Sequence, residues 1–135
     1  MRADAKGRQK DSTRRLRPRV AATITLRIDL QNGRVGPGKV LLLERIVEHG
    51  SIAAAGRTLG MSYRRAWELI DELNTCFGAP VVRARTGGKH GGGAIVTALG
   101  LAVMAHYRGL ESKVELVSRP HLRKLARAGR HGVVD

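Results

Sequence analysis

The sequence predicts a mainly α-helical fold with a small β-sheet, of the winged helix-turn-helix class with a long C-terminal helix. Residues 50–77 hold two capped helical patterns joined by a glycine turn. Residues 81–96 hold a glycine-rich stretch between two short strand patterns, and residues 97–118 hold a long apolar helical repeat. With 135 residues, the chain has the length of one domain.

Basic charge is concentrated at the two ends of the chain. The formal net charge is +14; residues 1–20 hold eight basic and two acidic side chains, and residues 119–135 hold five basic and one acidic. We expect residues 1–20 to be a disordered basic arm, residues 21–118 to be the folded domain, and residues 119–135 to be a basic tail. This charge favours a polyanionic partner such as double-stranded DNA, although a charged tail is more often only solvated.

The domain is predicted to begin with a strand and a helix. Residues 24–30 alternate apolar and polar side chains, which is typical of a strand with one buried face. Gln31-Asn32-Gly33 ends this strand, and Gly36-Pro37-Gly38 forms a turn. A helix is then expected from about Lys39 to His49 as the first helix of the unit. The strand is available to complete a small sheet with the wing.

Residues 50–77 carry the helix-turn-helix pattern. Gly50 can end one helix and Ser51 can cap the next, because glycine accepts the left-handed conformation and a serine hydroxyl accepts from a free amide. Leu59-Gly60-Met61 is the turn, and Ser62 caps the second helix. Apolar residues then recur at intervals of four, three and four and form one stripe, at Ala66, Ile70, Leu73 and Phe77.

A wing is predicted after the second helix. Residues 81–85 and 94–96 read as short strands, and Thr86–Gly93 between them contains five glycines. A nucleotide-binding P-loop is not expected, because His90 rather than Ser or Thr follows Lys89 and the glycines lead to a strand. A merely flexible hairpin tip is the alternative.

The first turn of the second helix and the wing are the candidate DNA-binding surface. A recognition helix presents its first turn to base edges and phosphates, where the helix dipole also favours anions. Two capped helices with a glycine turn also occur in other helical proteins, and the helix pair alone therefore does not identify a DNA-binding protein. The predicted wing and the basic charge support that interpretation. The candidate residues are Ser51, Ser62, Tyr63, Arg64, Arg65, Arg83, Arg85, Lys89 and His90.

The last expected helix is long enough for a second use. Thr97 caps it, and it runs to about Ser118, before Arg119-Pro120, a length of about 33 Å. Its apolar residues are spaced as in a coiled-coil seam, which predicts a dimerisation helix over residues 97–118. The seam residues are Leu99, Val103, Tyr107, Leu110, Val114 and Val117. The alternative is that this stripe only covers the domain's own sheet.

The chain resembles the N-terminal DNA-binding domain of the ModE-type molybdate-responsive transcriptional regulators, a winged helix-turn-helix related to the LysR type. The resemblance covers roughly residues 23–118, in the segments GRVGPGKVLLLERI, GSIAAAGRTLGMSYRRAWELIDELN and RARTGGKHGGGAIVTALG. The patterns G-G-G-A-x-V-T and M-S-Y-x-x-A-W are specific to that family, whereas GS-x-x-x-A is shared more widely with LysR-type regulators. The resemblance implies a bacterial, cytoplasmic homodimer that binds a palindromic operator and regulates transcription.

Molybdate binding is not expected from this chain. Full-length members of the family carry C-terminal domains that bind molybdate or tungstate, whereas this sequence continues after Pro120 with a basic segment that ends LRKLARAGRHGVVD. We therefore expect no cofactor, and the regulatory input is left open.

No catalytic or metal site is predicted. The five histidines are scattered, and Cys76 has no adjacent base in the sequence, so we expect no enzyme. No apolar run approaches the ~18 residues of a membrane span, and a cytoplasmic protein without a membrane partner is expected. The alternative function is a nonspecific nucleoid-type architectural DNA-binding protein that uses its basic tails.

Overall fold

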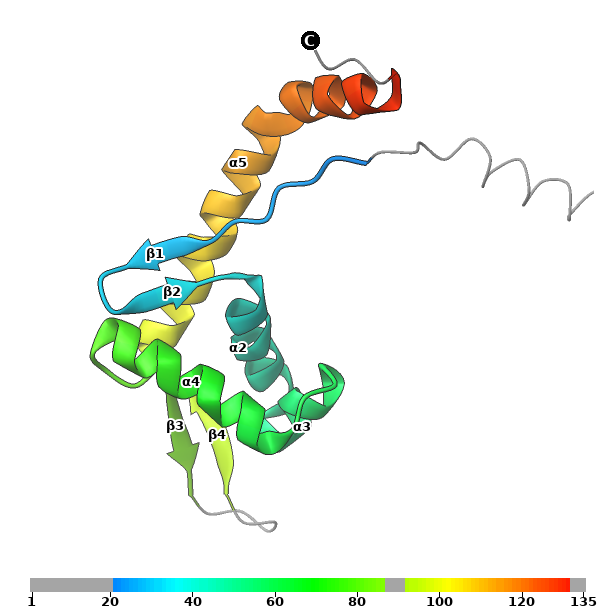
Figure 1. The fold of residues 1–135 in the computed structure, drawn as a ribbon. Coiled ribbons are helices and arrows are strands. Elements are labelled where there is room, and N and C mark those ends of the chain that lie inside the picture. Colours follow the sequence, from blue (N-terminus) through cyan, green and yellow to red (C-terminus); the bar gives the residue numbers. More distant parts are fainter. Residues whose placement is uncertain (1–20, 87–91, 132–135) are drawn as a thin grey trace, which may run out of the picture. The chain divides into compact units, whose positions relative to one another are not determined.

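The computed structural model describes residues 21–86 and 92–131 (Figure 1). Residues 25–113 form one compact unit, and the described residues of a second unit are 21–24 and 114–131. The described chain is mainly helical with two small antiparallel sheets, which confirms the predicted fold class. Its elements are β1 (Ile28–Leu30), β2 (Gly33–Val35), α2 (Pro37–His49), α3 (Ile52–Thr58), α4 (Tyr63–Phe77), β3 (Val82–Arg85), β4 (Gly93–Val96) and α5 (Ala98–His131).

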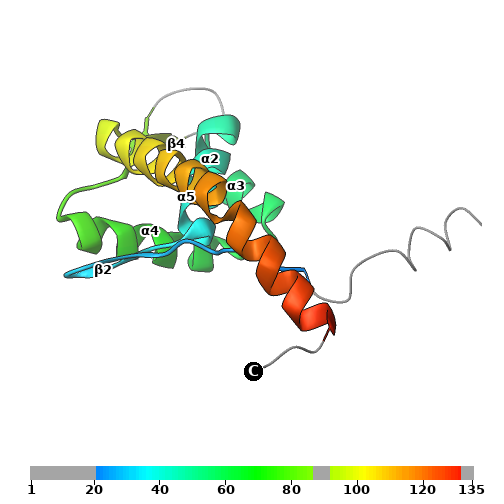
Figure 2. The same ribbon diagram turned by 90° about the horizontal axis from the view of Figure 1, so that it is seen from above.

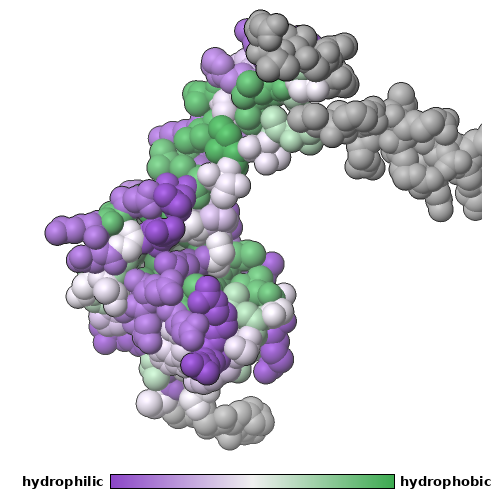
Figure 3. Space-filling view, in the orientation of Figure 1, coloured by the Kyte–Doolittle hydropathy of each residue, from purple (hydrophilic) through white to green (hydrophobic). Residues whose placement is uncertain are grey.

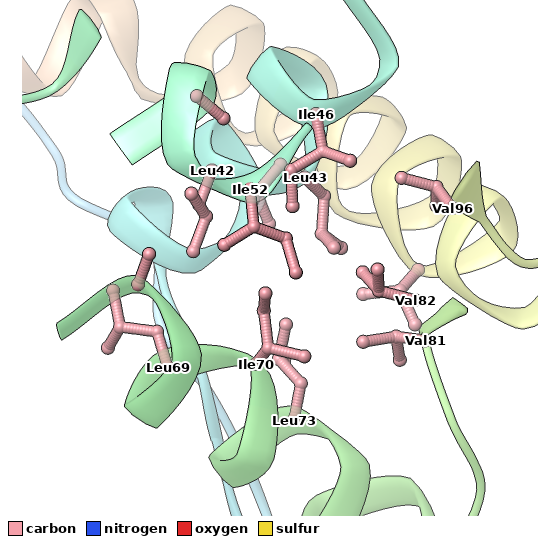
Figure 4. Close-up of a cluster of buried hydrophobic side chains, with 14 of the residues drawn as sticks. Leu42, Leu43, Ile46, Ile52, Leu69, Ile70, Leu73, Val81, Val82 and Val96 are labelled. Carbon is pink, nitrogen blue, oxygen red and sulfur yellow. The ribbon is translucent and has the colours of Figure 1, made fainter. Parts of the chain in front are cut away.

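The core of residues 25–113 lies between α2, α3, α4 and the β3–β4 hairpin. Leu43 and Ile46 of α2 lie opposite Ile70 and Leu73 of α4, and all four side chains are buried (Figure 4). The predicted apolar stripe of α4 is confirmed, because Ala66, Ile70 and Leu73 are buried and Phe77 packs against the core. This packing holds α3 and α4 in the helix-turn-helix arrangement.

Local capping sets the boundaries of these helices, as predicted. The Ser51 hydroxyl accepts a hydrogen bond from the Ala54 amide at 2.9 Å, and the Ser62 hydroxyl accepts one from the Arg65 amide at 3.0 Å. Gly50 ends α2 with a φ of 71°, a left-handed conformation that glycine adopts without a steric penalty.

The first hairpin corrects the predicted strand over residues 24–30. Only Ile28–Leu30 is a strand, and it pairs with β2, which was not predicted, instead of completing a sheet with the wing. Leu30 pairs with Gly33, so the loop of this tight hairpin holds the two residues Gln31 and Asn32. Within the described residues, the Leu26 carbonyl does not pair with a neighbouring strand. It accepts a hydrogen bond of 2.8 Å from the Tyr107 hydroxyl.

The second hairpin has the predicted strands. β3 and β4 are antiparallel, with Val82 opposite Val96 and Arg85 opposite Gly93. Val82 and Val96 are buried against the core, whereas Arg83 and Arg85 are exposed. The predicted tip residues Lys89 and His90 lie outside the described residues.

Helix α5 begins as predicted but ends later. The Thr97 hydroxyl accepts from the Gly100 amide at 3.1 Å and so caps the helix, whose first turns lie beside α2 and β4 (Figure 2). The predicted end near Ser118 is wrong, because α5 continues through Pro120 to His131. A proline removes one amide donor and bends a helix, but the Leu, Arg, Lys and Ala residues after it are strong helix formers that continue it.

The predicted seam of α5 is divided between two environments. Val103 and Tyr107 are buried in the core of residues 25–113, and Leu99 packs against that core, so these three are used within the chain. Leu110 is 44% exposed and Val117 is 68% exposed, whereas Val114 is half-buried. Figure 3 shows hydrophobic atoms along the later part of α5. The first half of the seam therefore packs within the chain's own fold, which is closer to the alternative interpretation than to a dimer contact.

Candidate nucleic-acid interface

The first turn of α4 presents three large side chains to solvent. Tyr63 is 56% exposed, and the side chains of Arg64 and Arg65 are 89% and 53% exposed. Their positions follow from the helical period, because the apolar stripe faces α2 and these residues fall on the remaining surface. Figure 3 shows that the surface over α4 is mainly hydrophilic. This turn is therefore free to meet a polar partner.

Charge along α4 changes sign from its start to its middle. Arg64 and Arg65 stand at the amino end, where the helix dipole is positive, and Glu68, Asp71 and Glu72 follow. Glu72 pairs with Lys39 of α2 at 3.0 Å, so part of this acidic group is used within the fold. An anionic partner is thus attracted to the first turn and repelled from the middle of the helix.

The hairpin is attached to the helix-turn-helix by two backbone amides. The Ala94 amide donates to the Gly50 carbonyl at 2.8 Å, and the Val81 amide donates to Oδ1 of Asn74 at 2.8 Å. Val81 is fully buried, so its amide needs this partner. The wing and helices α3 and α4 therefore form one piece.

Arg85 reaches from the hairpin to the turn between α2 and α3. A Cβ placed on Gly50 would lie 3.4 Å from Nη2 of Arg85, and a Cβ on Gly93 would lie 3.0 Å from the same atom. The guanidinium thus lies close to Gly50, which precedes the capping residue Ser51. Arg83, on the same strand, lines a groove with Pro80, Ile95 and Leu99, among others.

The sequence is similar to those of known bacterial helix-turn-helix proteins. The family model of the LysR family of bacterial regulatory helix-turn-helix proteins matches residues 39–101. The molybdenum-pterin-binding protein MopA of Rhodobacter capsulatus is 46% identical over 78 residues, which are 58% of this chain and 29% of MopA. The DNA-binding transcriptional dual regulator ModE of Escherichia coli K12 is 37% identical over 87 residues, which are 64% of this chain and 33% of that protein. The chain contains a ModE-type helix-turn-helix domain.

The similarity to these relatives is partial. The chain spans about a third of the length of the curated relatives that it matches. The matched residues of the family model run from the start of α2 to the first turn of α5. They thus include α3, α4 and the β3–β4 hairpin of the ModE-type domain.

The ModE-type domain brings some predicted site residues together and leaves others apart. Arg64 and Arg65 converge on one carboxylate, that of Glu68, at 3.5 and 3.1 Å. Ser51 and Ser62 serve as caps, so their hydroxyl oxygens already accept from the chain's own amides. Arg85 lies at the α2–α3 turn, and Lys89 and His90 are outside the described residues.

Three further residues shape this surface and were not among the predicted sites. Trp67 packs edge-on to Tyr63, with ring centroids 6.4 Å apart, and Glu68 pairs with both arginines. In the sequence, Trp67 follows Tyr63 by four residues, and Glu68 follows Arg64 by four and Arg65 by three. These spacings bring side chains together on a helix and were the signal from which the contacts could be predicted. The role of Asn74 could not be predicted from local spacing. It accepts from the Val81 amide, which lies beyond the end of α4 and after the turn that follows it.

The described residues of the ModE-type domain show no metal centre. Across residues 21–86 and 92–131, no group of three His, Cys, Asp or Glu side chains is placed to hold a metal ion. In the same residues, no helix is both long enough and apolar enough to cross a membrane.

Proposed function

We propose that this chain is a sequence-specific DNA-binding transcriptional regulator that acts in the cytoplasm and is not an enzyme. The first turn of α4 would enter the major groove, with Tyr63, Arg64 and Arg65 at base edges and phosphates. Arg83, Arg85, Lys89 and His90 of the wing would contact the backbone.

One observation carries this proposal: a serine-capped helix whose first turn exposes Tyr63, Arg64 and Arg65. The cap leaves the amino end of α4 open and electropositive, and the acidic residues behind it allow only this end to approach DNA closely. The hydrogen bonds from Ala94 and Val81 fix the wing to the same piece, so both elements would engage one duplex.

The names of the relatives support DNA as the partner. The Escherichia coli relative is named a DNA-binding transcriptional dual regulator, and this chain aligns with about a third of it. MopA is named a molybdenum-pterin-binding protein, but the shared part covers only 29% of it. We propose DNA binding, without a molybdenum ligand, for the chain described.

A homodimer would supply the length of site that one recognition helix lacks. Two copies related by a two-fold axis would place two α4 helices in successive major grooves, about 34 to 36 Å apart, on a palindromic operator. The exposed apolar side chains of α5 after Tyr107, Leu110, Leu116, Val117 and Leu125, are the proposed contact.

The test is selection from a randomised DNA duplex library, followed by measurement of affinity for the selected duplex. Arg64→Ala and Arg65→Ala should each weaken binding by about 1 to 3 kcal/mol if the lost contact is to a base. Arg45→Ala is the matched control, because Arg45 pairs with Glu48 at i,i+3 on α2, as Arg65 pairs with Glu68 on α4.

Two results would contradict the proposal. Equal binding by both variants and the wild type would remove α4 from the interface. Failure to enrich any sequence, with tight binding to random duplex, would favour an architectural protein that binds through its charge.

A further inference from the structure

Glu68 joins the two arginines of the recognition surface. Its Oε2 lies 3.5 Å from Nε of Arg64, and its Oε1 lies 3.1 Å from Nη1 of Arg65. Glu68 follows Arg64 by four residues and Arg65 by three, and both spacings bring side chains together on a helix. Each carboxylate oxygen therefore serves one arginine.

The second turn of α4 thus orders the first. Trp67 packs against the core and holds the Tyr63 ring at an interplanar angle of 83°, while Glu68 holds the neighbouring arginines. A free arginine side chain loses about 2 kcal/mol of rotamer entropy when it is fixed. Part of that loss is already incurred before any partner binds, which makes the surface preorganised.

The charge of Glu68 opposes general affinity for DNA. Arg64 and Arg65 together carry two positive charges, and the carboxylate between them halves the net charge at the point of closest approach. If this surface only attracted phosphates, the carboxylate would weaken that attraction without any gain. Glu72 of the same helix differs, because it pairs with Lys39 across the fold.

The contacts still leave donors for bases. Arg64 is held through Nε, so its two terminal nitrogens remain available, and Arg65 is held through one terminal nitrogen. A guanine is read by two parallel N–H donors from one arginine, which needs a defined guanidinium orientation. Phosphates accept an arginine in many orientations and gain little from such a constraint.

We propose that Glu68 is a specificity-determining positioning residue, which directs Arg64 and Arg65 toward base edges at the expense of phosphate contacts. This inference rests on the proposed function. Without the carboxylate, the arginines turn to the nearest phosphates of any sequence.

The experiment compares Glu68→Gln with Glu48→Gln in the full chain. Glu48 pairs with Arg45 at 3.2 Å on α2, also at i,i+3, so the control removes the same charge from a similar pair. Affinities are measured for the duplex that the wild type selects from a random library and for a scrambled duplex of the same composition, over a range of salt concentrations.

Glu68→Gln should bind the scrambled duplex more tightly than the wild type and lower the ratio of selected to scrambled affinity by about tenfold, as expected for one lost bidentate base contact. Its salt dependence on scrambled duplex should steepen by about 0.9 per added phosphate contact. Glu48→Gln should leave the ratio and the slope close to those of the wild type.

Three outcomes would overturn the inference. An unchanged ratio in Glu68→Gln means that the carboxylate only lowers affinity for all DNA. An equal loss of ratio in Glu48→Gln means that total charge, and not Glu68, sets discrimination. If the wild type selects no sequence, the proposed function fails and the inference fails with it.

Discussion

The hydroxyl of Tyr107 donates a hydrogen bond of 2.8 Å to the carbonyl oxygen of Leu26, which lies 81 residues earlier in the chain. Tyr107 is only 1% exposed, and its burial raises the pKa of the hydroxyl, so the group stays protonated and keeps its donor. The bond ties α5 to the segment that leads into β1. A carbonyl outside any strand is thereby satisfied.

Tyr107→Phe should lower the free energy of unfolding by about 0.5 to 1.5 kcal/mol, the net contribution of one such hydrogen bond. Tyr63→Phe is the control, because it removes the same oxygen from a side chain that is 56% exposed. Urea denaturation followed by circular dichroism measures both. Equal stability of the two variants would show that the Leu26 contact does not stabilise the fold.

Gly100→Ala should destabilise the protein, although alanine favours helices. A Cβ at Gly100 would lie 2.5 Å from the Val81 carbonyl oxygen and 2.5 Å from Cγ1 of Val96, so α5 would have to move away from the hairpin. We expect a loss of about 1 to 3 kcal/mol, as for other overpacked sites. Gly109→Ala, in the same helix with no atom within 4 Å of the new Cβ, should instead add about 0.5 to 1 kcal/mol. Thermal unfolding would contradict this account if both variants shifted in the same direction.

Glu44→Gln should lower stability at neutral pH but not in acid. Arg108 donates to both carboxylate oxygens of Glu44, at 2.8 and 2.7 Å, and this hydrogen bonding holds the pKa of Glu44 below its ordinary value of 4.5. Because the folded pKa lies below the unfolded one, the stabilisation is present above the unfolded pKa and is lost as the pH falls through the folded pKa.

The two side chains of this pair are 38% and 27% exposed, so the difference between the wild type and Glu44→Gln should be about 1 kcal/mol or less near pH 7. Denaturation at several pH values should show that difference closing below pH ~4. The exposed Glu48 gives the control substitution Glu48→Gln, which should change stability less. A difference that stays constant with pH would exclude the Arg108 pair as its cause.

Leu110→Glu combined with Val117→Glu should convert the proposed dimer into a folded monomer. Both side chains are exposed within the chain, so the substitutions need not disturb its core, whereas like charges across a two-fold contact are costly. Ser112→Glu combined with Arg119→Gln lowers the net charge by the same amount on the same helix. Analytical sedimentation at micromolar concentration distinguishes the outcomes. A dimeric Leu110→Glu, Val117→Glu variant would place the contact elsewhere.

Local signals in the sequence were sufficient for the helix-turn-helix. Ser51 and Ser62 are caps because a serine oxygen can satisfy amides only within its own first turn, and Gly50 ends a helix through its own backbone freedom. The wing strands were equally local, since they flank a glycine-rich sequence. The caps and the two strands depend on neighbours in sequence, and the structure has them where they were expected.

The remaining features depend on competition between distant groups. The spacing of Val103 and Tyr107 identified a helical face but not its partner, and the core of residues 25–113 covers that face. Pro120 predicted the end of the last helix, but the strong helix formers after it continue α5 to His131. The strand after Asn32 is only three residues long, too short for a period-two pattern to be visible.

The carbonyl of Gly50 has a consequence for the way this protein would read DNA. It belongs to the residue that closes α2, it precedes the cap of α3, and it accepts the amide of Ala94 in the wing. The wing cannot move relative to the helix-turn-helix without breaking this hydrogen bond, so the distance between the two elements is fixed. If the chain binds DNA as proposed, the duplex would have to adapt its shape to that distance. Sequences whose duplex bends or whose groove narrows easily would then be favoured, even at positions that no side chain touches.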